Sequence, residues 1–448
     1  MRILVVGGDA AGMSAASQIR RRQPNWTVEA FEMGIRTSYG LCGTPYYIGG
    51  MMKSVDDLVT LTPEQFERDR GIKVHIRHQV VAVNPAKKSI TVKDLANGRK
   101  RDENYDQLVL ATGAEPIVPA GLEPTHPNVF YLRSIDEAGR IRERALNSKR
   151  AVVVGAGYIG LEVAENLAQA GLSVTLLGRK VAPIFELELQ NLALSALTRG
   201  GVEFRGDTDA TGVRQIDGGS MEVLTSQGEA SKADLVVVGT GVSPRSELAA
   251  AAGLDLGVKQ SISVDRHQRT SNPFIYSAGD CAESHHLVTK KSTYIALALG
   301  ANRQGRIAGM NICGMSVKSP EILGTSVMKV FDVGLARTGL GFEEALKAGF
   351  KNAARTVVKQ SSKPHYYPGH SEVTAIIIFD KVTGRILGGQ LGGGVDAVGQ
   401  RINTLAAAIT AGMTVREAGD LDTAYAPPFS PVFDPVVIAC EVAAKSLK

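Results

Sequence analysis

A repeated pattern of apolar strand, glycine-rich turn and helix constrains the fold of this chain more than any other feature. "RILVVGGDAAG" opens the sequence, and "AVVVGAGYIG" repeats the pattern from residue 151. A continuous apolar run suits a buried parallel strand, and the glycines let the backbone approach a pyrophosphate where the next helix starts. Two such units in one chain rarely arise by chance, so the sequence predicts two dinucleotide-binding sites.

The first unit departs from the usual glycine pattern at one position. Asp9 stands where G-x-G-x-x-G has its middle glycine, although Gly8 lies beside it. Glu32 ends the second strand, "TVEAFE", where a carboxylate binds ribose hydroxyls. We predict that this unit binds its dinucleotide through Gly7, Gly8, Ala11, Gly12 and Glu32.

The second unit has every glycine but lacks the acid. Aligning "SVTLLG" on "TVEAFE" puts Gly178 at the place of Glu32, and Arg179 and Lys180 follow. A missing carboxylate with adjacent cations favours a 2′-phosphate, hence NADPH over NADH. The alternative is that both cations only solvate the end of a loop. The predicted cofactor-binding residues here are Gly155, Gly157, Tyr158, Ile159, Gly160, Arg179 and Lys180.

Size, charge and cysteine content narrow the class of protein. At 448 residues the chain should hold about three domains. Its net charge of +5 comes without a basic stripe, which favours small anionic ligands over nucleic acid. We expect a cytoplasmic protein without membrane contact, because neither a signal peptide nor an apolar run of about 18 residues is present. Four cysteines without disulfide or zinc spacing are typical of a reducing compartment. We expect no metal site, since the adjacent His285 and His286 lack partner ligands.

One cysteine stands out by its surroundings. Cys42 lies in "TSYGLCGTPYYIGG", between two glycines and far from any second thiol. Thr44 as N-cap and Pro45 as first helical residue predict a helix that begins just after it. The positive end of that helix would lower the pKa of the thiol. A small buried hydrophobic residue is the usual role of a lone cysteine, but here we predict a redox role.

Several further segments carry a resemblance to a known family. "YDQLVLATGAEP" (105–116), "NPFIYSAGDCAE" (272–283) and "LVVVGTGVSPRSEL" (235–248) resemble signatures of flavoproteins with two dinucleotide domains. The Cys42 segment resembles the single-cysteine branch of the pyridine nucleotide-disulfide oxidoreductases, which holds coenzyme A-disulfide reductase, NADH oxidase, NADH peroxidase and persulfide reductase. "HYYPGH" and "AYAPPFSPVFDP" near the C-terminus look most like the coenzyme A-disulfide reductases.

The resemblance implies a fold and an assembly. It implies an α/β protein with two Rossmann-like domains, one for FAD (1–118 and 244–322) and one for NAD(P) (119–243). An α+β dimerisation domain (323–448) follows. In this family that domain forms a homodimer and sends residues into the active site of the partner.

The resemblance also implies an activity. Hydride would pass from NAD(P)H to FAD and then to a mixed disulfide between Cys42 and coenzyme A (CoA), releasing CoA as thiol. Persulfide or polysulfide reduction would use the same cysteine, and NADH oxidase or a redox-sensing flavoprotein are further alternatives. Oxidase and peroxidase relatives carry a histidine in the first glycine turn, where this chain has Ala10. A methyl group gives no proton, which disfavours peroxide and oxygen reduction.

Individual roles follow from the resemblance as expectations. Tyr158 would cover the flavin until nicotinamide arrives, Glu162 would lie beside the nicotinamide, and Asp280 would bind the ribityl chain. Val80, Thr112, Gly113 and Gly279 would contact the cofactor. A helix starting in "STYIALALG" (292–300) would face the flavin. Cys281, Cys313 and Cys440 are assigned to packing.

Substrate roles are expected for two further groups. Tyr425 and Tyr366, the latter in preference to Tyr367, would donate a hydrogen bond or proton to the departing thiolate. The alternative is that their segments only pack the dimer. Arg20 and Arg22 in "QIRRRQP" would bind CoA phosphates, or would only complement the C-terminus of the first helix. Ser38, Asn302 and Arg303 are further candidate substrate-binding residues.

Overall fold

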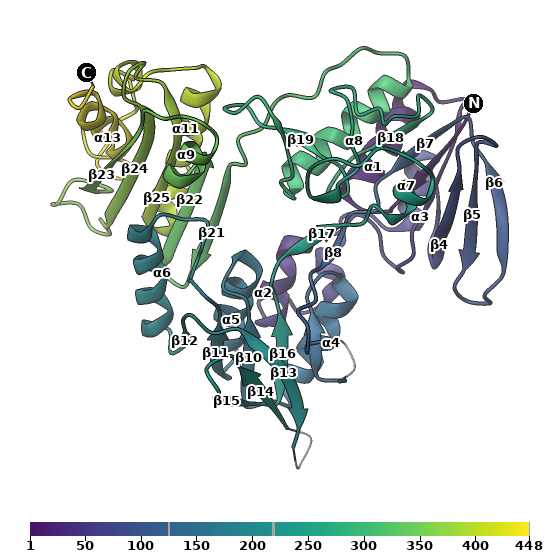
Figure 1. Ribbon diagram of the computed structural model, residues 1–448, viewed down its shortest axis with the longest axis horizontal. Coiled ribbons are helices and arrows are strands. Elements are labelled where there is room, and N and C mark those ends of the chain that lie inside the picture. The colour runs from purple at the N-terminus through teal and green to yellow at the C-terminus, as the bar shows by residue number, and fades with distance from the viewer. Residues whose placement is uncertain (124–125, 217–219, 448) are drawn as a thin grey trace.

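Three five-stranded sheets with their helices organise the molecule, and smaller sheets of two or three strands accompany them. A computed structural model describes residues 1–123, 126–216 and 220–447. Figure 1 shows the N-terminal sheet on the right, the C-terminal sheet on the left, and the second glycine-turn unit below and between them. No helix in the described ranges has the length and apolar character needed to cross a bilayer.

The first sheet is parallel throughout and contains the first glycine-turn unit. Its strand order is β18 (Ile275–Ser277), β7 (Gln107–Leu110), β1 (Arg2–Val6), β2 (Thr27–Phe31) and β3 (Lys73–His75). Strand β1 is apolar because helices α1 (Ala10–Arg22) and α8 (Ala298–Ile312) cover one of its faces and buried residues of the segment 78–94 cover the other. The other elements of this part are β4 (His78–Asn84), β5 (Ser89–Asp94), β6 (Lys100–Asn104), α3 (Pro63–Arg70), α7 (Glu247–Ala251), β19 (Ser284–His285) and β20 (Ser292–Thr293), whereas α2 (Thr44–Ile48) packs against helices of the second glycine-turn unit.

The second sheet repeats the parallel design. Its strand order is β12 (Glu203–Arg205), β11 (Ser173–Leu177), β10 (Arg150–Val154), β16 (Leu235–Val238) and β9 (Val129–Tyr131). Helices α4 (Ile135–Leu146), α5 (Tyr158–Gln169) and α6 (Leu187–Arg199) belong to it, and β13 (Ala210–Gln215), β14 (Met221–Thr225) and β15 (Ala230–Ala233) form a side sheet. An antiparallel pair, β8 (Ala114–Pro116) and β17 (Val242–Pro244), lies where the chain passes between the two parallel sheets.

The third sheet is antiparallel. Its strand order is β21 (Ser326–Val330), β22 (Val333–Gly339), β25 (Ile386–Gly394), β24 (Glu372–Asp380) and β23 (Ala353–Ser361). Helices α9 (Phe342–Lys347), α10 (Val395–Val398), α11 (Arg401–Thr410), α12 (Val415–Gly419) and α13 (Pro435–Ala444) accompany it. Two parallel α/β sheets and one α+β unit confirm the predicted fold class. We propose that the predicted domain boundaries, 118, 244 and 323, separate these three units.

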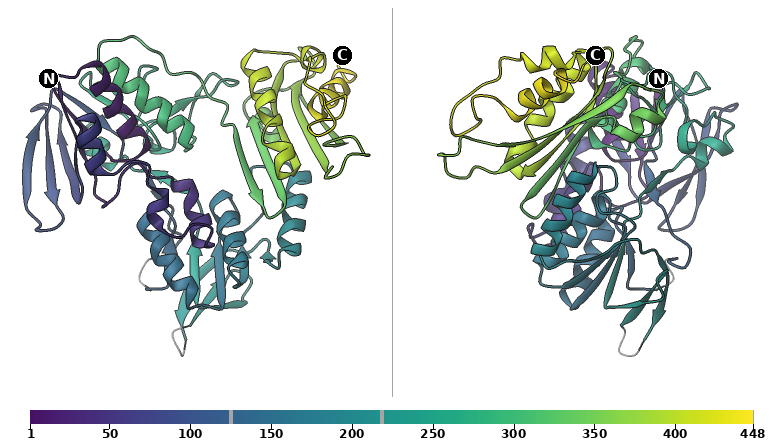
Figure 2. Two further views of the ribbon diagram at one scale, coloured as in Figure 1. Left: turned by 180° about the vertical axis from the view of Figure 1, so that it is seen from behind. Right: turned by 60° about the vertical axis from the view of Figure 1, so that its left-hand side comes forward.

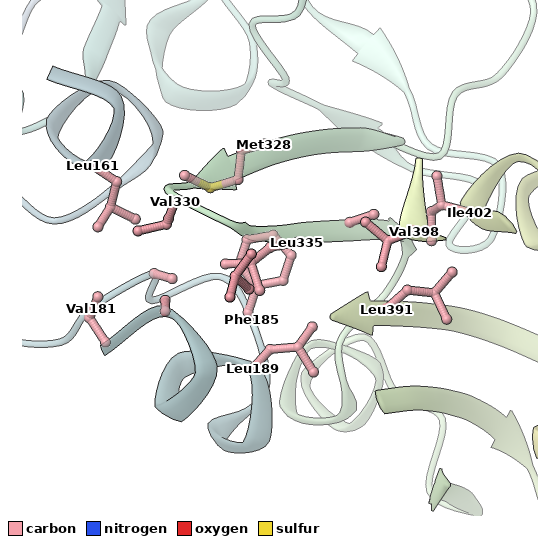
Figure 3. Packing of buried hydrophobic residues seen from close by; sticks show 14 of the residues in the cluster. Leu161, Val181, Phe185, Leu189, Met328, Val330, Leu335, Leu391, Val398 and Ile402 are labelled. Atoms are coloured by element: carbon pink, nitrogen blue, oxygen red, sulfur yellow. The ribbon is translucent and has the colours of Figure 1, made fainter. Parts of the chain in front are cut away.

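One hydrophobic core joins the second unit to the C-terminal sheet. Leu161, Phe185 and Leu189 of the second unit pack with Met328 and Leu335 in a single cluster, drawn in Figure 3. Seen from behind in Figure 2, helix α6 stands beside the C-terminal sheet. Each such side chain contributes about 2 kcal/mol when fully buried. The shared core therefore fixes how these two units sit against each other, whereas the first sheet has clusters of its own.

Candidate active site

The two glycine turns follow the same backbone path. A Cβ atom on Gly12 would lie 2.0 Å from the carbonyl oxygen of Gly7, and one on Gly160 would lie 1.7 Å from that of Gly155. Both contacts are far below van der Waals distance, so the helix can approach the strand only where glycine stands. A Cβ on Gly157, in contrast, would meet nothing within 4 Å. This open space at the start of α5 fits the close approach of a pyrophosphate.

Glu32 faces the first turn as the dinucleotide pattern requires. Its carboxylate accepts hydrogen bonds from the amides of Gly8 and Gly34, both at 2.7 Å. It also lines a cavity of about 920 Å³, together with Arg133 and Arg245. Cavities of this size hold cofactors. The carboxylate, the glycine turn and the cavity thus fit a bound FAD, with Glu32 available to ribose hydroxyls.

The carboxyl ends of β7 and β18 bring further predicted residues to the same edge. Thr112 and Gly113 follow β7, and Gly279 and Asp280 follow β18; both strands run parallel to β1. The hydroxyl of Thr112 donates to the carbonyl of Arg245 at 2.5 Å. Helix α8 begins at Ala298, within the predicted segment 292–300.

Sequence reasoning missed Arg133. Its guanidinium donates to Asp280 at 2.6 Å and to the carbonyl of Ala114 at 3.0 Å. The only signal in the sequence was a cation directly after the apolar strand β9. Val80 lies in β4, where it is buried and paired with Val92 of β5, so its contact with the cofactor stays a prediction.

The helix predicted after Cys42 is present, but its first residues differ from the prediction. A short 3₁₀ helix, Leu41–Gly43, carries Cys42 and continues directly into α2 at Thr44. Thr44 is therefore a helical residue and not the N-cap: its hydroxyl donates to the carbonyl of Leu41 at 2.6 Å, and Gly43 precedes the helix. Pro45 takes the second helical position. The continuous turn removes the extended residue that an N-cap needs.

The predicted lowering of the pKa of Cys42 is wrong. Burial by surrounding protein raises the pKa of this thiol, and the carboxylates of Glu162 and Asp280 raise it further, while Arg133 acts in the opposite direction. A helix of five residues supplies too little positive charge to offset these effects. The thiol still reaches solvent. All four cysteines lie in the described residues and are free; Cys42 is exposed, Cys313 is intermediate, and Cys281 and Cys440 are buried.

Glu162 belongs to a carboxylate pair on α5. Burial raises the pKa of Glu162 to about 7, helped by Glu165 and opposed by Lys329. Glu165 is fully buried and forms an ion pair with Lys329 of β21. The Lys329 ammonium also lies 5.7 Å from the ring centre of Tyr46, on α2. Sequence reasoning missed Glu165 and Lys329, because no local pattern indicates a contact across 164 residues.

Tyr158 opens α5 and reaches the C-terminal sheet. Its hydroxyl forms a hydrogen bond with that of Ser326, and its ring meets Phe185 edge-on at 6.3 Å. The neighbouring Ile159 packs against the shared core. The side chain predicted to cover the flavin is thus held by the third unit.

The predicted cations follow β11 directly. The side chain of Arg179 is 80% exposed, and its ion pair with Asp209 at 3.3 Å is also exposed. Surface pairs of this kind contribute little, so the guanidinium remains available to a phosphate. Lys180 is likewise exposed.

The two arginines predicted to bind substrate make different hydrogen bonds. Arg20 donates to the carbonyls of Trp26 and Arg70, which favours its alternative role at the C-terminus of α1. Arg22 donates to Gln18 on the same helix. Helices α1 and α8 pack together, and the hydroxyl of Ser14 bonds to the side chain of Asn302 at 2.9 Å. Arg303 is exposed on the same helix as Asn302.

The two predicted catalytic tyrosines lie together on the third unit. Tyr366 is 73% exposed and Tyr425 46%, and the interaction of the two phenol groups raises the pKa of Tyr366. Around Tyr425 the chain exposes further apolar side chains, those of Phe429, Val432 and Phe433. This surface is apolar and contains a pair of phenols.

Comparison with known proteins places the whole chain. The family described as "Pyridine nucleotide-disulphide oxidoreductase" matches residues 1–305, and its dimerisation domain matches residues 325–436. A Pyrococcus horikoshii "NAD(P)H coenzyme A polysulfide/persulfide reductase" is 36% identical over 98% of each chain. A Staphylococcus epidermidis "Coenzyme A disulfide reductase" is 30% identical over 96% of each.

Solved structures agree with this placement. The reduced Bacillus anthracis CoADR-RHD superposes with a TM-score of 0.94 at 35% identity, over 99% of this chain and 80% of that one. An engineered water-forming NADPH oxidase bound to NADPH, a mutant of LbNOX, gives 0.94 at 30% identity, over 99% and 98%. This chain therefore belongs to the pyridine nucleotide-disulphide oxidoreductase family, as a flavin-dependent enzyme that uses FAD and NAD(P)H.

Proposed function

We propose that the protein reduces CoA disulfide with NAD(P)H through a mixed disulfide between Cys42 and CoA. One observation carries this proposal: the exposed cysteine among the four lies close enough to Glu162, Asp280 and Arg133 for their charges to shift its pKa. Those residues come from both glycine-turn units, so a thiol accessible to solvent lies where two dinucleotides would meet. The Staphylococcus epidermidis relative is named for this reaction.

The chemistry of Cys42 balances without a second protein thiol. Its thiolate attacks one sulfur of CoA disulfide, so that a Cys42–S–S–CoA bond forms and the disulfide bond of the substrate breaks. One CoA leaves as a thiolate and takes a proton. A pair of electrons then cleaves the mixed disulfide, which releases the second CoA and restores the Cys42 thiolate. When bound, FAD supplies the two-electron chemistry that links NAD(P)H to this step.

The proton for the departing CoA would come from a second copy of the chain. The phenol groups of Tyr366 and Tyr425 lie near each other on the unit that matches the family's dimerisation domain. Their apolar surroundings suit burial in a dimer interface. In a homodimer this pair would lie beside the partner's Cys42 and donate a hydrogen bond to the sulfur that leaves.

The phosphates of CoA would bind along α1 and α8. Arg303 is exposed on α8, and Asn302 beside it is linked to Ser14 of α1. Arg22 lies at the end of α1 and keeps part of its side chain exposed. Two arginines from adjacent helices can form charge-assisted hydrogen bonds with phosphate oxygens. Arg20, already bonded to backbone carbonyls, would act only by supporting this end of the helix.

NADPH is the nicotinamide cofactor that we propose. The engineered oxidase bound to NADPH carries an Asp→Ala and an adjacent Ala→Arg replacement relative to its parent, which is described as an NADH oxidase. Gly178 and Arg179 show the same combination of a small residue followed by arginine. The exposed guanidinium of Arg179 would pair with the 2′-phosphate.

Persulfide or polysulfide reduction is the second candidate. It is favoured by the 36% identity to the Pyrococcus horikoshii relative, whose name gives that activity. Cys42 would serve in the same way, with a sulfane sulfur in place of one CoA. Oxygen or peroxide reduction is disfavoured because Ala10 provides no proton donor beside the first turn.

The test follows NAD(P)H consumption with CoA disulfide, polysulfide, peroxide and air as separate acceptors. We expect CoA disulfide to give the highest kcat/KM, and Cys42→Ser to lower that value at least about 10³-fold with FAD content unchanged. Cys313→Ser, a less exposed thiol outside the site, is the control and should retain full activity. Turnover only with air would contradict the proposal, and so would activity retained by Cys42→Ser. A clear preference for polysulfide would select the second candidate, and no turnover with any acceptor would indicate a sensor.

A further inference from the structure

We propose that Asp9 is a positioning residue that fixes the segment carrying Cys42 against the first glycine turn. This inference rests on the role of Cys42 proposed above. Asp9 is the residue that breaks the glycine pattern, and neither binding of the dinucleotide nor packing of the turn accounts for a carboxylate at this place.

Two successive amides of the Cys42 segment bind to two successive residues of the turn. The amide of Ser38 donates to the carbonyl of Gly8 at 3.0 Å, and the amide of Tyr39 donates to Oδ1 of Asp9 at 3.1 Å. Cys42 follows three residues later. The carboxylate thus supplies one of the two bonds that join the turn to this segment at its N-terminal end.

The segment needs such an attachment because its backbone is strained. Ser38 has a φ of +47°, in the left-handed region that costs energy for a residue with a side chain. On the opposite side, the amide of Thr60 donates to the carbonyl of Ser38, and the amide of Gly40 donates to that of Leu58, both at 2.8 Å. Ser38 and its neighbours are therefore held between the glycine turn and the 58–60 strand-like segment.

The carboxylate of Asp9 is not used as a helix cap. Asp9 occupies the N-cap position of α1, where aspartate usually binds the amide of the second or third helical residue. Here the side chain of Asp9 forms no hydrogen bond with either of these two amides, which both lie in the described part of the chain. The second turn has Gly157 at the matching position and starts its helix equally well without a side chain. Asp9 therefore does not cap the helix as aspartate usually does at this position; its carboxylate accepts a hydrogen bond from the amide of Tyr39 instead.

Charge and geometry can be separated by experiment. Burial raises the pKa of Asp9 to about 6, with Glu32 adding to the effect and the amides of Tyr39 and Ala10 and the cation Arg133 opposing it. Asp9 in turn raises the pKa of Cys42. Asp9→Asn keeps an oxygen for the Tyr39 amide but removes the charge, whereas Asp9→Gly removes both the oxygen and the charge and restores the full glycine pattern.

The test compares Asp9→Asn and Asp9→Gly as FAD-loaded full-length proteins. Hydrogen exchange of the peptide covering residues 37–42 should be about tenfold faster in Asp9→Gly than in the wild type, because one backbone hydrogen bond is lost. Asp9→Asn should restore wild-type exchange. With CoA disulfide, kcat should fall about tenfold in Asp9→Gly at unchanged KM, since misplacing the reacting sulfur costs rate and not binding. Asp9→Asn should stay within about twofold of wild type.

Alkylation adds one further readout, and a further variant covers a failure of Asp9→Gly to fold. Alkylation of Cys42 should begin at lower pH in both variants, because both lose the Asp9 charge, while alkylation of Cys313 serves as an internal control. If Asp9→Gly fails to fold, Asp9→Ala gives the same comparison with an ordinary residue. Exchange at 37–42 that is the same in Asp9→Gly and the wild type would overturn the proposal. An Asn variant as impaired as the Gly variant would also overturn it. Exchange does not depend on the acceptor, so it judges this inference even if the proposed substrate is wrong.

Discussion

The two glycine turns share a backbone and differ in nearly every side chain around it. The first turn presents carboxylates, Asp9 and Glu32, and its helix α1 packs against α8 of the same unit. The second turn has Gly157 and Gly178 at the matching places, an exposed Arg179, and a helix that packs against β21 of the C-terminal sheet. Glycines at the strand–helix contact therefore fix the fold, while a few neighbouring positions decide which ligand each turn binds and which unit its helix packs against.

The largest effect on stability should come from replacing the last glycine of the turn, which is Gly12 in the first unit and Gly160 in the second. In Gly160→Val the new Cβ would lie 1.7 Å from the carbonyl of Gly155, so α5 cannot stay against β10. We expect more than about 4 kcal/mol loss in the free energy of unfolding, or no folded protein. Gly157→Ala is the matched control, because its Cβ meets open space, and should change the free energy by less than about 1 kcal/mol. Urea denaturation of both variants makes the measurement, and equal losses would refute the shared-backbone argument.

The attachment of α5 to the C-terminal sheet should give the next largest effect. Lys329→Met leaves the fully buried Glu165 without its cation, and we expect a loss of about 3 kcal/mol. Arg199→Met is the control: it breaks an ion pair with Asp332 whose side chains are 56% and 70% exposed, and should cost less than about 1 kcal/mol. Thermal or urea denaturation compares the two. A Lys329 variant as mild as the Arg199 variant would show that this attachment does not depend on charge.

A pH-dependent effect on stability should accompany the carboxylate of Glu162 in the second unit. The pKa of Glu162 is raised from 4.5 to about 7, so the folded protein holds a proton that the unfolded chain releases earlier. The resulting stability is complete below pH 4.5 and is lost as the pH rises through about 7. Glu162→Gln cannot ionise; it should match the wild type near pH 5 and exceed it by about 2 kcal/mol at pH 8. Denaturation at both pH values makes the comparison, and a pH-independent difference would rule out this titration.

The smallest effect should be a change in cofactor preference, at the end of β11, where Arg179 would select the dinucleotide of the second unit. Arg179→Ala should raise the KM for NADPH about tenfold and leave that for NADH within about twofold, because only the 2′-phosphate loses a partner. Steady-state kinetics with both cofactors makes the measurement, and NADH, which lacks the 2′-phosphate, is the control. Equal losses with NADH and NADPH would assign Arg179 to folding instead of cofactor choice.

Features that depend on local sequence were predictable. The period of apolar residues and the glycines placed β1, α1, β10 and α5, and the Thr44–Pro45 pair indicated a helix after Cys42. The N-cap was misplaced because a 3₁₀ turn runs into α2 without a break. Such a continuous turn depends on how Leu41 and Thr44 bond to each other, and residue type alone does not reveal it.

Features that depend on distant contacts were missed. Arg133 meets Asp280 across 147 residues, and Lys329 meets Glu165 across 164. The prediction of a lowered pKa for Cys42 failed for the same reason: it considered only the neighbouring helix, whereas burial and carboxylates from three other segments raise the pKa. Asp9 was visible as a departure from the glycine pattern, yet its bond to Tyr39 appears only in the folded chain.

Mass spectrometry of the protein after incubation with CoA disulfide, without reductant, tests the role of Cys42 most directly. We expect a mass increase of one CoA per chain, located on the peptide that contains Cys42 and reversed by dithiothreitol. A CoA adduct on Cys313, Cys281 or Cys440 in its place, or an unmodified Cys42 in protein that still turns over CoA disulfide, would contradict it.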